Sequence, residues 1–121
     1  MYKRQGMDMF TNMKINKIKK CVQHKNYEGI LPYCEAEEPE IRIAAAEGLA
    51  EIGNDEANNA LIGMLRDHDM SVKIAAVNAL GKVKEFRSST FISHEMEHSK
   101  DEAFVAACKR ALGAIHDGGH E

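Results

Sequence analysis

One segment of the chain occurs three times at a nearly constant spacing, and this repeat constrains the fold more than any other feature. Residues 41–53, 72–84 and 104–116 align without gaps at offsets of 31 and then 32 residues. Their apolar positions recur at i, i+3, i+4, i+8 and i+11, the spacing of the buried stripe of an α-helix. Each copy is therefore predicted to be a helix. The aligned sets are Ile41/Val72/Phe104, Ala44/Ala75/Ala107, Ala45/Ala76/Cys108, Leu49/Leu80/Leu112 and Ile52/Val83/Ile115.

The segments between these copies repeat as well. Residues 26–38 align with residues 57–69, and residues 88–98 form a weaker third copy. Each unit is therefore predicted to contain a first helix, a tight turn and an Ala-rich second helix. Gly53 is predicted to end one helix and Asp55 to cap the next.

A recurring motif places an aliphatic residue and a basic residue before an Ala-Ala pair and a leucine. It reads Ile41-Arg42, Ala44-Ala45 and Leu49 in the first copy, and Val72-Lys73, Ala75-Ala76 and Leu80-Gly81 in the second. This motif resembles the HEAT-like repeat family, in the short variety first recognised in phycobilisome lyases. The resemblance implies an all-α, right-handed α-solenoid of about three helical hairpins plus an N-terminal capping helix. It also suggests that Arg42 and Lys73 pair with acids in the turns between helices.

We expect a single domain over residues 9–116, with a cap helix at 9–25 and repeats at about 26–54, 55–85 and 86–116. Extending the repeat towards the N-terminus puts Phe10, Met13, Lys14, Ile18 and Cys21 on core positions. Because Lys14 stands where alanine belongs, this helix is predicted to be a cap with one solvated face. Residues 1–8 are predicted to be a disordered or cloning-derived tail, and residues 117–121 a C-terminal tail.

Composition and charge restrict the classes of partner. No apolar run approaches the ~20 residues of a membrane span, and no apolar segment follows the first charges as in a signal peptide. Three cysteines without a CxxC pair argue against a disulfide framework, so a cytoplasmic protein is expected, away from membranes. Residues 1–26 carry seven Lys or Arg against one acid, whereas residues 27–71 carry eleven acids against two bases. Those acids disfavour nucleic acid as a partner, despite the N-terminal lysines.

The sharpest catalytic motif is the HExxH segment at residues 94–98. On a helix it would place His94 and His98 one turn apart, as in zinc sites, with Glu95 as a general base. No third ligand follows at a suitable spacing, and the repeat directs Ile92 and Met96 to the core, so both histidines should face solvent. We therefore predict no catalytic residue, metal or cofactor, with His94 and His98 as the candidates if a metal were bound. The alternative is an enzyme or enzyme subunit, either bilin-lyase-like or metal-dependent through this motif.

The favoured function is a non-catalytic protein-interaction or scaffolding module. The resemblance implies that the second helices line a concave face, where non-core positions form three rows across the repeats. A partner segment would bind there, unless these side chains merely touch neighbouring helices. A homodimer through the exposed ends of the solenoid is a further possibility. The rows are Ile43/Ile74/Ala106, Ala46/Val77/Lys109 and Glu47/Asn78/Arg110.

Overall fold

The computed structural model describes residues 9–119, and within this range the chain forms helices and turns without any strand. None of these helices combines the length and apolar character that crossing a bilayer requires. The predicted all-α solenoid is confirmed, whereas the tail predicted at residues 1–8 lies outside the described range. The α-helices are α1 (Met9–Gln23), α2 (Tyr27–Ile30), α3 (Pro39–Ile52), α4 (Asp55–Met64), α5 (Met70–Val83), α6 (Ser89–Glu97) and α7 (Glu102–Gly119).

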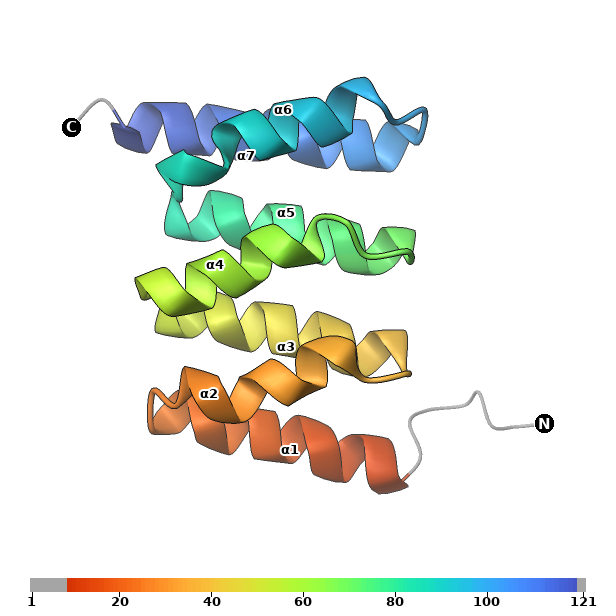
Figure 1. The fold of residues 1–121 in the computed structure, drawn as a ribbon, viewed down its shortest axis with the longest axis vertical. Helices are drawn as coiled ribbons and strands as arrows, with labels where there is room; N and C mark the ends of the chain where they lie inside the picture. Colours follow the sequence, from red (N-terminus) through yellow and green to blue (C-terminus); the bar gives the residue numbers. More distant parts are fainter. Residues whose placement is uncertain (1–8, 120–121) are drawn as a thin grey trace.

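The helices form two layers (Figure 1). The second helices α3, α5 and α7 pack side by side, and α1 extends this layer by packing on α3. The first helices α2, α4 and α6 cover one side of that layer, each in contact with the second helix of its own unit. In the described part of the chain, α4 and α6 make almost no close contact with each other. The second helices therefore hold the stack together.

The turns follow from a few side chains. Gly53 ends α3 in the left-handed conformation at φ 67°. The next helix is capped by Asn54, whose side chain accepts a hydrogen bond from the Ala57 amide at 2.8 Å, so the predicted Asp55 cap is wrong by one residue. Asp69 caps α5 in the same way, through the Ser71 amide. An Asn and an Asp at these N-caps satisfy amides that the helix leaves without partners.

The first unit has an incomplete first helix. Its α2 is only four residues long and continues as a 3-10 turn over Leu31–Glu35. Pro32 lies at the start of that turn, and its ring and missing amide hydrogen are incompatible with the interior of an α-helix. The sequence repeat predicted a regular helix here, and proline accounts for the difference.

The core runs through the length of the stack. Ile41, Val72 and Phe104 lie at the same position of successive second helices, and all three are fully buried. Leu49 and Leu80 are also fully buried, as the repeat predicted. On α1, however, Phe10 is 67% and Met13 is 48% exposed, so their predicted core positions are wrong. The buried residues of α1 are Thr11 and Ile18, whereas Phe10 and Met13 lie on the part of its surface that the other described helices leave uncovered.

Buried polar side chains connect the units. The Arg42 guanidinium donates hydrogen bonds to both carboxylate oxygens of Asp67, at 2.9 and 3.1 Å, and to the carbonyls of Ala36 and Glu37. Lys73 lies 3.4 Å from a carboxylate oxygen of Glu95 and above the ring of Phe104. The predicted pairing of Arg42 with an acid in a turn is confirmed, whereas the partner of Lys73 lies within α6.

The C-terminal boundary differs from the predicted one. Helix α7 continues to Gly119, so residues 117–119 are helical rather than part of a tail. A glycine costs only about 1 kcal/mol in a helix, so Gly118 and Gly119 are compatible with the last turn of α7. The final two residues lie outside the described range.

Candidate functional site

The structure places the predicted binding residues on α3, α5 and α7, but it does not expose all of them. Ile43 and Ile74 are half-buried against the core. Ala46 and Val77 have no exposed surface. The exposed members are Glu47, Asn78, Ala106, Lys109 and Arg110.

Ala46 and Val77 therefore cannot contact a partner, and their assignment to a binding surface is wrong. Val77 lies one turn before Gly81, where an added Cβ would lie 3.0 Å from Ala111 of α7. This side of a second helix thus packs on the next second helix, and Ala46 has the same place on α3. The aligned Lys109 is exposed because no described helix packs beyond α7.

Two hollows follow the exposed side of the second helices. One, of about 390 Å³, lies between α1 and α3, and the other, of about 340 Å³, lies between α3 and α5. Both include Glu47 and Glu51, so they form one continuous surface. Glu51 and Lys82 were missed by the sequence analysis, although each lies one turn after a predicted residue. We call this the second-helix surface. Its exposed residues are Glu47, Glu51, Asn78 and Lys82, and the aligned Ala106 and Arg110 continue it on α7.

Charges are distributed unevenly along this surface. The carboxylates of Glu47 and Glu51 form no ion pair with any residue between 9 and 119. Lys19 borders them on the α1 side and Lys82 on the α5 side. The centre of the surface is thus acidic, and its flanks are basic.

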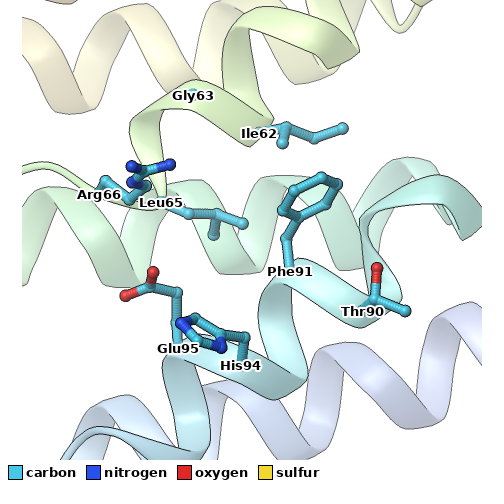
Figure 2. Close-up of a pocket in the computed structure, with 8 residues that line it drawn as sticks. All are labelled: Ile62, Gly63, Leu65, Arg66, Thr90, Phe91, His94 and Glu95. Carbon is cyan, nitrogen blue, oxygen red and sulfur yellow. The ribbon is translucent and has the colours of Figure 1, made fainter.

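A larger hollow, of about 660 Å³, lies on the other layer, between α4 and α6 (Figure 2). Phe91 extends from α6 towards Ile62 of α4, and its side chain is 51% exposed. An added Cβ at Gly63 would meet no atom within 4 Å, so the wall is open there. The sequence analysis did not identify this hollow. We call it the α4–α6 groove, and its lining residues are Ile62, Gly63, Leu65, Arg66, Thr90, Phe91, His94 and Glu95.

The polar half of the groove contains Arg66, Glu95 and His94, away from Ile62 and Phe91 (Figure 2). Glu95 is neutralised by Lys73 of α5. The guanidinium of the exposed Arg66 forms no hydrogen bond or ion pair with any residue of the described range. The groove thus offers an apolar floor at one end and an uncompensated cation at the other.

The HExxH residues lie at the end of α6. The rings of His94 and His98 are 4.3 Å apart between centroids, and both side chains are exposed, as predicted. Nδ1 of His98 lies 2.8 Å from the His94 carbonyl oxygen, while Glu95 pairs with Lys73 rather than remaining available as a base. Within residues 9–119, no three or more His, Cys, Asp or Glu side chains group to hold a metal ion.

Two of the three cysteines, Cys34 and Cys108, do not have the properties of nucleophiles. Cys108 is fully buried in α7, and Cys34 is half-buried within the 3-10 turn. Burial raises the pKa of each thiol to about 11. Since the thiolate is the reactive species, both behave as small apolar side chains at neutral pH.

Comparison with protein families gives a match to HEAT repeats over residues 27–113. None of the curated proteins compared with the chain matches it. The finer resemblance to repeats of the phycobilisome-lyase type stays a prediction, because the matching family describes HEAT repeats in general. The match covers most of the chain and includes its stacked helical hairpins from α2 to α7. This protein therefore belongs to the HEAT repeat family.

Proposed function

We propose that the protein is a non-catalytic interaction module that binds a segment of a partner protein on the second-helix surface. HEAT repeats are typically scaffolds for protein interactions, which supports the general class of function. The observation that favours this surface is the continuity of its two hollows through Glu47 and Glu51. An extended or helical segment could cross α1, α3 and α5 without interruption.

The chemistry of the surface suggests the kind of segment that it binds. Glu47 and Glu51 offer two carboxylates one helical turn apart, beside the half-buried Ala44 and Ala75. Basic side chains of a partner would pair with these carboxylates, and small apolar side chains would fit above the alanines. We therefore propose a basic, weakly amphipathic segment as the partner.

The test is site-specific photocrosslinking in the cells that produce the protein. A photoreactive residue replaces Glu47 or Asn78 on this surface, and Glu28 on α2 serves as an exposed control. We expect a discrete adduct from the first two positions, and its loss when Glu51→Lys is added. Adducts that form only from position 28, or that persist unchanged with Glu51→Lys, would contradict the proposal.

The catalytic alternative has weaker support. Glu95 is paired with Lys73, and His94 and His98 have no third ligand nearby within the described residues. We also propose a cytoplasmic location, which the three free thiols support.

Self-association is a further part of this proposal, through the α1 end of the solenoid. Met9, Phe10 and Met13 are 69%, 67% and 48% exposed there. At the α7 end, Lys109 occupies the position that faces the next helix in earlier units, which disfavours a second copy. Sedimentation of the Phe10→Ser variant tests this: a dimer that persists unchanged would rule out the α1 end.

A further inference from the structure

The α4–α6 groove is distinct from the second-helix surface, since it lies on the layer of first helices. We propose that it is a second docking site, which accepts a short acidic amphipathic segment of another protein. One apolar side chain of that segment covers Phe91 and Ile62, and a carboxylate pairs with Arg66.

The apolar half of the groove provides the anchor point. Phe91 is 51% exposed and extends towards Ile62, which is itself half-buried (Figure 2). A volume of about 660 Å³ lies within the range of ~300–1,000 Å³ in which ligand-binding clefts fall. Because α4 and α6 hardly contact each other, this apolar surface has no cover from the described chain.

The polar half of the groove determines the charge of the occupant. Three carboxylates near Arg66 are already engaged: Asp67 accepts from Arg42, Asp69 caps α5, and Glu95 pairs with Lys73. The guanidinium of Arg66 is left without a partner among the described residues, and guanidinium is the donor best suited to bind a carboxylate in two places. A basic occupant would face this cation without compensation. The groove therefore favours an acidic segment.

The separation of Ile62 and Arg66 sets the pattern of the segment. Ile62 lies in α4 and Arg66 lies in the turn directly after it, four residues later, which corresponds to about 6 Å for a helical rise. A partner helix presents an apolar side chain and a carboxylate at this separation when they are four residues apart. The required chemistry is thus a leucine-like residue followed one turn later by Glu or Asp.

The probes are two capped, Ala-rich helical peptides with a leucine at the same place. Four residues later, one peptide has Glu and the other has Lys. Titration into the isotope-labelled protein is followed by the amide signal of Gly63 within the groove, with Gly113 on α7 as a remote reference. We expect the acidic peptide to bind about five- to tenfold more tightly, as one charge-assisted contact would give. This preference for the acidic peptide should decrease as the salt concentration rises.

Reversing the charge at position 66 tests whether Arg66 itself selects the acidic peptide. Arg66→Glu should reverse the preference in favour of the Lys peptide, whereas Phe91→Ala should weaken the binding of both peptides. Lys109→Glu is the matched control, because it changes the net charge equally but lies at the exposed end of α7, outside the groove and the second-helix surface. It should leave the preference of the wild-type protein intact.

Several results would overturn the proposal. One is equal affinity for the two peptides, and another is a preference that Arg66→Glu does not alter. Shifts at Gly113 without shifts at Gly63 would place the peptide elsewhere. A Gly63 signal that depends on protein concentration without peptide, together with a dimer that Phe91→Ala abolishes, would show that a second copy occupies the groove. Because the second-helix surface is unchanged by Arg66→Glu and Phe91→Ala, its own crosslinking test stands or fails separately.

Discussion

Replacing Gly81 by alanine should destabilise the protein, although alanine is the better helix former. Gly81 lies near the end of α5 and faces α7. A Cβ at this position would lie 3.0 Å from both Cα and Cβ of Ala111. Carbon atoms prefer separations of about 3.5–4.0 Å, so the two helices must move apart. A backbone atom cannot avoid the contact by a change of rotamer.

Two opposing free-energy terms determine how much Gly81→Ala changes the stability. Alanine gains about 1 kcal/mol over glycine inside a helix. Overpacking of a well-packed contact costs about 1–3 kcal/mol. The expected net loss is therefore about 1 kcal/mol in the free energy of unfolding.

Gly113 provides a matched control, because it is the aligned residue of the next unit and lies within α7. An added Cβ there meets nothing within 4 Å, so only the helix-propensity term remains. Gly113→Ala should thus stabilise the protein by about 1 kcal/mol. The same substitution at equivalent positions is expected to have opposite signs.

Urea unfolding followed by circular dichroism measures both changes, provided that the denaturant slope stays constant. The Ala111→Gly change removes one of the two contacting atoms, so combining it with Gly81→Ala should reveal a favourable coupling between the two sites. A Gly81→Ala protein as stable as Gly113→Ala would refute the reasoning, because close approach of α5 and α7 would then impose no constraint.

Three further perturbations test the polar and buried groups. Arg42→Met removes the cation that pairs with the largely buried carboxylate of Asp67 and the donor to two carbonyls, so urea unfolding should show a loss of about 3–5 kcal/mol; an effect no larger than that of Lys73→Met would count against this. Hydrogen bonds from Arg87 lower the pKa of Glu85 from 4.5 to about 2. The ionised Glu85 carboxylate therefore contributes fully to stability above pH 4.5, and this contribution is lost as the pH falls towards 2. Glu85→Gln should reduce the dependence of the melting temperature on pH across that window. Cys108, with its thiol buried and its pKa raised to about 11, should resist iodoacetamide at neutral pH until urea unfolds the protein, and rapid alkylation of the native protein would contradict its buried position.

Local periodicity predicted the second helices well but could not identify which flank of each helix meets its neighbour. Ala46 and Val77 appeared available on a helical wheel, yet the structure buries them between consecutive second helices. A signal was present in the alignment, since the third copy replaces these apolar residues with Lys109. Comparison of inner and terminal repeats would have indicated an interface between units.

The α4–α6 groove was harder to foresee, because it arises from the distance between two first helices rather than from either helix alone. The one feature of the sequence that indicates this groove is Phe91, which occupies the position where the preceding unit has the smaller Ala60. The incomplete first helix of the first unit could have been predicted, since Pro32 lies in the middle of the segment that would otherwise be helical.

That short first helix also determines where the molecule should open first. The four-residue α2 and its 3-10 turn offer few protected amides, so we expect their hydrogens to exchange with solvent fastest among the three units. Opening there would release the carbonyls of Ala36 and Glu37 from Arg42 but leave its pair with Asp67 intact. The opening would therefore stop at α3. The first unit would unfold locally. The amide hydrogens of the two later units, which are joined through α5, would exchange only when the whole stack unfolds.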